Sequence, residues 1–149
     1  MNLGPVLPTD NRRLECVASG LAIHHGAQLA VDTTLVSPLT REGVSRPRAL
    51  KEDGAALEDA RKRKEKRYPE LRGSRRCLLV VTGMEVGGRW SQEALDFVQT
   101  LAAAKARDAS RQLQASAYHG WKSRWTSFVS MAGMKAFADT LLYGHAKEY

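Results

Sequence analysis

The chain has 149 residues, 43% of them hydrophobic and 26% charged, which is the balance of a globular protein with one core and excludes disorder along the whole length. Its formal net charge of +7 favours polyanions as partners, nucleic acid first and an acidic membrane surface second. No apolar run is long enough to span a membrane and no secretory signal is visible, so we expect an intracellular protein. The two cysteines form no metal motif, and we expect both to be buried free thiols.

The first third of the chain predicts two strands. Residues 1–11 contain glycine and two prolines and predict an irregular leader. Residues 12–19 alternate well enough for a short strand that carries Glu15. Residues 28–38 form a β-branched, apolar run closed by Pro38, which predicts a buried strand with Asp32 at its centre. The loop over residues 38–53 is long for a compact domain, which makes it either mobile or functional.

A charged helix is predicted over residues 54–68, with Asp53 as its N-cap. Its thin apolar stripe consists of Leu57, Ala60 and Tyr68. At about 100° per residue, Lys64 falls on the same side as this stripe, whereas most of the other basic residues face solvent. One lysine of the cluster should therefore point at the sheet.

The second half of the chain predicts one more strand and then helices. Residues 77–82 read as a strand inside the sheet, and residues 83–89 as a glycine-rich turn. Ser91 caps a predicted helix over residues 92–107, and residues 111–142 form either one long helix or two that break near Gly133. We therefore predict an α/β domain over residues 12–107, a small mixed sheet flanked by helices, with a helical extension over residues 108–149.

Three polar residues are predicted to point into this domain: Glu15, Asp32 and Lys64. A carboxylate inside an apolar strand is costly unless it is paired or binds a cation. Two carboxylates on neighbouring strands can share Mg²⁺ or Mn²⁺, one of whose water ligands can act as a nucleophile. A nearby lysine can orient that water or stabilise a pentavalent phosphate. Together these groups suffice for phosphodiester hydrolysis.

This pattern resembles the restriction-like endonuclease domain of site-specific non-LTR retrotransposons, a branch of the P-D-(D/E)-x-K nuclease superfamily. Arg13-Leu14-Glu15-Cys16-Val17 stands at the first motif, where the family has Pro-Asp. The segment Val31-Asp32-Thr33-Thr34-Leu35-Val36 matches the second motif, and Lys64-Glu65-Lys66-Arg67-Tyr68 matches the helix motif. The strand over 77–82, Gly83 and Trp90-Ser91 with the next helix resemble the end of that domain, so the resemblance covers about residues 12–103.

The resemblance implies a restriction-endonuclease-like core and a metal-dependent DNA endonuclease of retroelement origin, which would be nuclear. Glu15 and Asp32 would hold Mg²⁺ or Mn²⁺, and Lys64 would assist the attacking water. The superfamily's strand lysine, two residues past the acid, is Thr34 in this chain, so Lys64 would have to replace it. In that family the domain normally follows a reverse transcriptase in one polyprotein, so the chain would be a fragmentary or diverged copy.

Each of these residues also has a purely structural interpretation. Asp32 could pair with an arginine or bond a loop, Glu15 could be an exposed strand residue, and Lys64 could belong to a solvated basic run. The rest of the basic run offers candidate phosphate contacts for DNA binding, namely Arg61, Lys62, Arg63, Lys66 and Arg67. Trp121, Trp125 and Phe128 lie at helical spacing, which favours packing over base stacking.

Two further functions remain open beside the nuclease. The chain could be a catalytically inactive nucleic-acid-binding remnant of the same fold, which the Leu14-Glu15 and Thr34 departures favour. It could also be an interaction module whose C-terminal aromatic helix docks a protein partner.

Overall fold

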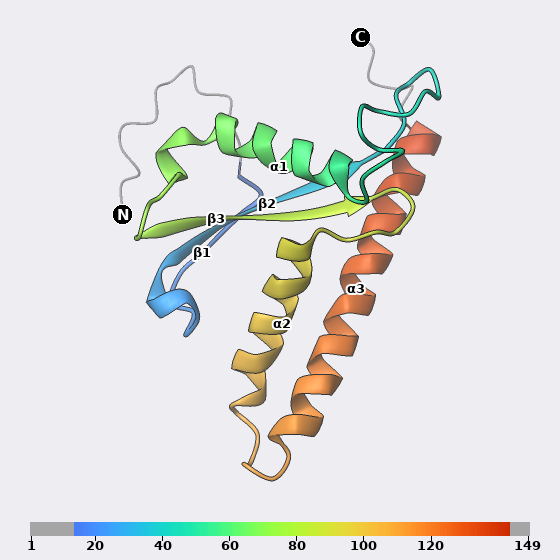
Figure 1. Cartoon of the computed structure of the whole chain (residues 1–149). Coiled ribbons are helices and arrows are strands. Elements are labelled where there is room, and N and C mark those ends of the chain that lie inside the picture. The colour runs from blue at the N-terminus through green and yellow to red at the C-terminus, as the bar shows by residue number, and fades with distance from the viewer. Residues whose placement is uncertain (1–13, 144–149) are drawn as a thin grey trace.

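The computed structural model describes residues 14–143, so the predicted leader and the last six residues lie outside the described part. Three strands and three long helices make up the fold (Figure 1). The strands are β1 (Cys16–Ala18), β2 (Gln28–Val36) and β3 (Cys77–Glu85), and the long helices are α1 (Ala55–Arg67), α2 (Gln92–Ala106) and α3 (Gln114–Tyr143). Two short 3-10 turns, η1 (His24–Gly26) and η2 (Pro69–Leu71), precede β2 and β3.

The sheet is small and mixed, as the sequence predicts. The strand order is β1-β2-β3, with β1 antiparallel and β3 parallel to β2. The register places Cys16 opposite Val31 and Asp32 beside Val81. The prediction that the strand beginning at Cys77 lies inside the sheet is wrong for the described residues, because β2 is the central strand and β3 is an edge.

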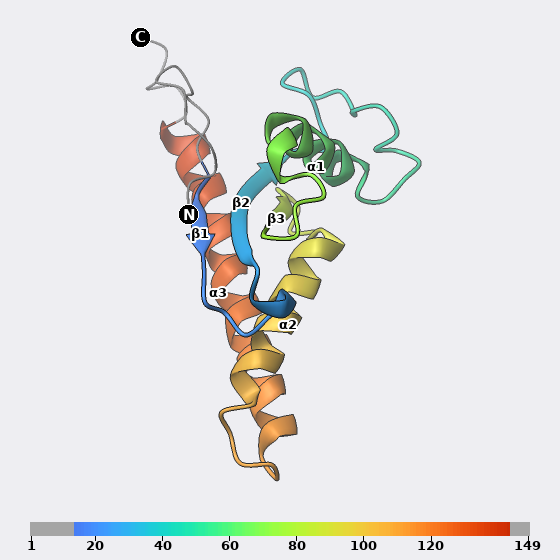
Figure 2. The ribbon, with the colours of Figure 1, turned by 90° about the vertical axis from the view of Figure 1, so that its left-hand side faces the viewer.

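Both faces of the sheet are covered, which explains why β3 is apolar although it is an edge strand. On one face Ala30 packs with Tyr68 and Cys77, and Val36 packs with α1. On the opposite face Leu29 and its neighbours pack against α2. Figures 1 and 2 show α1 on one side of β2 and β3 and the α2–α3 hairpin on the other. Asp32, two residues after Ala30, therefore points toward α1.

Helix α1 begins one residue later than predicted and without the predicted cap. Its N-cap is Gly54, which adopts a left-handed conformation with φ 80° and makes no side-chain capping bond. Asp53 instead forms an ion pair with Arg89, at 2.8 Å. The positive φ at residue 54 is easily adopted by glycine, so the cap position moves away from the aspartate.

Helices α2 and α3 form a hairpin that extends well beyond the sheet (Figure 1). Ser91 caps α2 as predicted, because its side chain accepts a hydrogen bond from Ala94 N at 3.2 Å. The final helical region is a single helix of 30 residues. Gly133 lies inside it, where a Cβ would overlap the side chain of Met84 on β3. This glycine therefore permits close packing and does not break the helix.

Of the predicted strand over residues 12–19, residues 12 and 13 lie outside the described part, and within residues 14–19 the strand covers Cys16–Ala18. It starts at Cys16, so Glu15 lies one residue before it, and Cys16 is exposed whereas Cys77 is buried. The prediction of two buried thiols is therefore wrong for Cys16, because a three-residue edge strand has few neighbours to cover it. Among residues 14–143 no helix combines the length and apolar character needed to cross a membrane.

The loop between β2 and α1 projects from the body of the molecule (Figure 2). The loop nevertheless makes hydrogen bonds within itself: the side-chain Nε of Arg46 donates to the backbone carbonyl of Ser37 at 2.8 Å. Arg48 forms ion pairs with Glu52, Glu58 and Asp59 at 2.7, 3.3 and 3.2 Å. The loop is thus anchored to the first turns of α1.

Candidate active site

Asp32 is the most deeply buried charged residue of the described chain. It is 2% exposed, and with Leu29 and Cys77 it is one of the three largest fully buried side chains among the described residues. On the same face of β2, Val36 packs against α1 and Ala30 packs against Tyr68, the residue that follows this helix. Burial of a carboxylate at this depth is costly unless the group has a charged or hydrogen-bonding partner.

Lys64 supplies that partner from α1. Its Nζ lies 2.8 Å from Oδ1 of Asp32 with hydrogen-bond geometry, and 2.8 Å from Oδ2. The contact with Oδ2 is one of charge alone, because Oδ2 is buried and receives no hydrogen bond. The Lys64 side chain is 21% exposed, so the ammonium lies at the boundary between interior and solvent. The predicted inward position of Lys64 is confirmed; its catalytic role stays a prediction.

Glu15, which lies just before β1, contacts the same part of β2 from the edge where β1 pairs with it. Its Oε2 accepts a hydrogen bond from Thr33 N at 3.1 Å, in the peptide that joins Asp32 to Thr33. The β1–β2 pairing ends at Val31, so the Glu15 side chain serves a backbone donor beyond the end of β1. Glu15 itself is exposed. The structure therefore brings all three predicted residues to the middle of β2, with Asp32 and Lys64 in direct contact and Glu15 against the adjoining backbone.

The donor chemistry of this site fits a hard divalent cation. Glu15 and Asp32 provide carboxylate oxygens, the donors that Mg²⁺ and Mn²⁺ prefer, and Asp32 Oδ2 is buried without a hydrogen-bond donor. No group of three or more His, Cys, Asp or Glu side chains within residues 14–143 is placed to hold a metal. Within that range the group in contact with Asp32 is the Lys64 ammonium, and the Glu15 carboxylate lies on the backbone of Thr33.

Sequence reasoning missed a second charged contact that lies beside this site. Glu93, in the first turn of α2, accepts hydrogen bonds from Val81 N at 3.1 Å and from Arg61 Nε at 2.6 Å. Val81 is the β3 neighbour of Asp32, and Arg61 lies one turn before Lys64. Glu93 thus links α2, β3 and α1 around the candidate site. An acid in the first turn of a helix also suits the helix dipole, so its sequence position gave no reason to expect this role.

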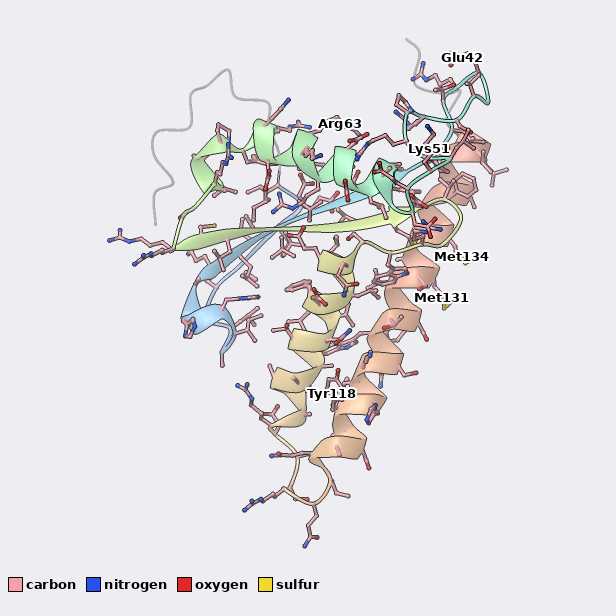
Figure 3. The ribbon with its side chains drawn as sticks, in the orientation of Figure 1. Glu42, Lys51, Arg63, Tyr118, Met131 and Met134 are labelled. Carbon is pink, nitrogen blue, oxygen red and sulfur yellow. The ribbon has the colours of Figure 1, made fainter. Side chains whose placement is uncertain are left out.

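The remaining basic residues of α1 divide into an inner and an outer group. Arg61 is half-buried, bound to Glu93 and 3.1 Å from Glu65, so it is less available for DNA than predicted. Lys62, Arg63, Lys66 and Arg67 are exposed, and Figure 3 shows Arg63 on the side of α1 away from the sheet. Arg72, Arg75 and Arg76, which sequence analysis did not single out, are also exposed. Residues 61–76 contain nine basic and two acidic side chains, which makes this segment the most basic part of the chain.

Comparison with known proteins gives no neighbour for this arrangement. No family model, no curated protein and no solved structure matches the chain.

Proposed function

We propose that the chain is a metal-dependent DNA endonuclease-like domain of retroelement origin that hydrolyses phosphodiester bonds. The observation that carries the proposal is the contact between Lys64 and Asp32, whose atoms meet at 2.8 Å although the residues are 32 positions apart. A buried acid, a lysine at the solvent boundary and a second carboxylate at the same peptide are the groups that this chemistry requires. The restriction-endonuclease-like core is part of the same proposal.

In this mechanism Glu15 and Asp32 would hold Mg²⁺ or Mn²⁺, which would supply Lewis acidity and lower the pKa of a bound water. Lys64 would move from Asp32 toward the substrate and stabilise the charge that develops on the phosphate. The exposed basic residues of α1 would hold the DNA backbone, without reading its sequence. Deep burial of Asp32 would keep its carboxylate fixed against β2, so Lys64 would be the group that moves.

The experiment is nicking of supercoiled plasmid by the purified chain with Mg²⁺ or Mn²⁺, with a chelator as the blank. Asp32→Asn and Glu15→Gln should abolish nicking, because each removes a carboxylate charge while preserving shape. Lys64→Arg keeps the positive charge but changes its geometry, and it should reduce nicking strongly. Lys62→Arg is the matched control from the outer face of α1. Full nicking by Asp32→Asn would remove Asp32 from the mechanism.

The same contact between Asp32 and Lys64 also supports a second candidate function, a non-catalytic nucleic-acid-binding remnant. The Lys64 ammonium pairs with Asp32, and Thr33 N donates to Glu15, so each of the two carboxylates already has a partner without a cation. A non-catalytic nucleic-acid-binding remnant would look the same. It predicts no cleavage by any form of the chain, together with DNA binding whose affinity falls steeply with ionic strength. Charge removal at Arg63 and Lys66 should weaken binding and reduce the salt slope.

A protein partner on the C-terminal helix is a third proposal. Trp121 and Trp125 of α3 lie 5.3 Å apart between ring centroids and are half-buried. Trp121 also lies 5.9 Å from Lys105 of α2, so it belongs to the α2–α3 contact. Phe128 is 56% exposed and is the member of the three that could meet a partner.

A further inference from the structure

A cavity lies between the sheet and the α2–α3 hairpin, on the face of the sheet opposite α1 (Figures 1 and 2). Val31, Thr33 and Leu35 line it from β2 and alternate with Asp32, so the cavity is separated from the candidate active site by the thickness of the sheet. Its volume is about 570 Å³. Sites for small organic ligands have volumes of roughly 300–1,000 Å³, so this cavity is of the right size for one.

The cavity exists because α3 does not close against the sheet. None of the three core clusters of the described residues contains a residue of α3. The helix approaches β3 at Gly133, where a Cβ would overlap Met84. The positions of α3 that line the cavity run from Trp125 to Ala136, about 16 Å along the helix. Native interiors leave few voids larger than a water molecule, so an apolar space of this length indicates a site for a ligand.

The walls of the cavity suit a hydrocarbon. They are mostly aliphatic and aromatic, with Phe97 and Leu101 of α2 among them, and no charged side chain of residues 14–143 lines the space. A polar contact is available at one point, where Thr82 Oγ1 donates to Thr33 Oγ1 at 3.1 Å. Sugars and nucleotides carry polar groups along their whole length and would lose hydrogen bonds to water here, whereas an alkyl chain would not.

A cation stands where the cavity opens to solvent. Phe128 lines the cavity and is 56% exposed, so its ring lies at the opening. The Arg124 guanidinium lies 5.4 Å from this ring and 5.7 Å from the ring of Trp121. Within residues 14–143 Arg124 makes no ion pair, and the whole chain has a net charge of +7. The charge of the opening is therefore complementary to an anion.

We propose that this cavity binds a single-chain fatty acid, with the hydrocarbon between the sheet and α3 and the carboxylate beside Arg124. An extended alkyl chain fits the apolar length of the lining, and the carboxylate stays at the solvent boundary, where it keeps part of its hydration. The site shares no side chain with the contact between Asp32 and Lys64. Asp32→Asn should therefore bind the fatty acid as tightly as the wild type does, whatever its effect on DNA.

Calorimetric titration of the full chain with decanoate tests the ligand class, with decanol as the uncharged ligand of the same chain length. We expect one decanoate per chain, with a negative heat-capacity change because apolar surface is buried. Arg124→Gln should weaken decanoate binding about two- to five-fold and leave decanol binding unchanged. Arg41→Gln, in the exposed loop before α1, is the matched control and should change neither. Equal loss of decanoate and decanol binding in Arg124→Gln would overturn the assignment of the carboxylate to Arg124.

Quenching of tryptophan fluorescence tests the location. Trp90 and Trp125 line the cavity, so 10-bromodecanoate should quench the wild type saturably. Ala132→Phe fills the space from α3 and should weaken binding about tenfold or more. Ala138→Phe, on the same helix outside the lining, should bind normally, and circular dichroism should show that both variants are folded. Absence of saturable quenching in the wild type, or wild-type affinity in folded Ala132→Phe, would overturn the proposal.

Discussion

The ion pair between Asp32 and Lys64 should contribute far more to stability than a surface ion pair. Lys64→Met removes the only charged partner that the described structure places on a carboxylate that is 2% exposed. Loss of one partner from a buried pair costs about 3–5 kcal/mol. Because the Lys64 side chain is 21% exposed, water can reach the vacated position, and we expect a value near the lower end, ~3 kcal/mol. For a chain of this size that corresponds to a decrease in Tm of roughly 6–12 °C.

A double-mutant cycle with Asp32→Asn isolates the pairwise free energy. Asparagine keeps the shape of the aspartate and leaves Lys64 access to solvent, so the single change should cost about 1–2 kcal/mol. The double variant buries a neutral amide instead of an unpaired charge and should be more stable than the sum of the single changes predicts. We expect a coupling free energy of about 2 kcal/mol in magnitude, measured by urea unfolding followed by circular dichroism.

The pair Lys135–Asp139 on α3 is the matched control. Its atoms approach to 2.7 Å, as close as those of the Asp32–Lys64 pair, but its side chains are 76% and 47% exposed. Exposed pairs of this kind couple by roughly 0.2–1 kcal/mol. If the two cycles give the same coupling free energy, the Lys64 ammonium is effectively solvated and the reasoning from burial is refuted.

Four further outcomes follow from contacts described above. Burial raises the pKa of the Cys77 thiol, so at neutral pH an alkylating reagent should modify the exposed Cys16 much faster than Cys77. Mass spectrometry of partly labelled protein measures the two rates, and equal rates would contradict the packing of β3. Ser91→Ala removes the acceptor for both Ala94 N and Gly83 N and should cost about 1–2 kcal/mol in urea unfolding, whereas Ser91→Asp should recover most of it. Glu93→Gln should lower the free energy of unfolding by about 1–2 kcal/mol, because it weakens the contact with Arg61. Glu93→Ala should lower it by more, because Val81 N also loses its acceptor. Hydrogen exchange at the Val81 amide should therefore be faster in Glu93→Ala than in Glu93→Gln. Gly83→Ala places a methyl group about 3.0 Å from Leu57 Cδ2 and should cost roughly 1–3 kcal/mol, with Gly87→Ala, where nothing lies within 4 Å, as the neutral comparison.

Periodicity was sufficient to predict which lysine turns inward. Leu57, Ala60 and Tyr68 are buried as the helical spacing predicts, and Lys64 lies with them and reaches Asp32. A run of basic residues carries no other mark that distinguishes Lys64. The prediction succeeded because the apolar residues alone fix how an amphipathic helix is rotated about its axis.

Contacts that depend on tertiary register could not be predicted in the same way. Glu93 meets Val81 and Arg61 only because α2 starts beneath α1, which no local pattern encodes. Asp53 is a good capping residue by type, but Gly54 follows it and Arg89 lies within reach, so the cap is lost to an ion pair. Gly133 suggested a break in the final helix, but its missing side chain leaves room for Met84 of β3, which lies 49 residues earlier in the chain.

The role of Asp32 is tested most directly by the rate at which Asp32→Asn nicks supercoiled plasmid in Mg²⁺, measured beside the wild type and an Asp96→Asn control. Asp96 is an exposed carboxylate on α2, bonded to Gln92 at 2.8 Å and outside the candidate site. We expect nicking by the wild type and the control, and none above the chelator blank by Asp32→Asn, with DNA binding preserved in all three. Nicking by Asp32→Asn at the wild-type rate, or none by the wild type, would contradict this expectation.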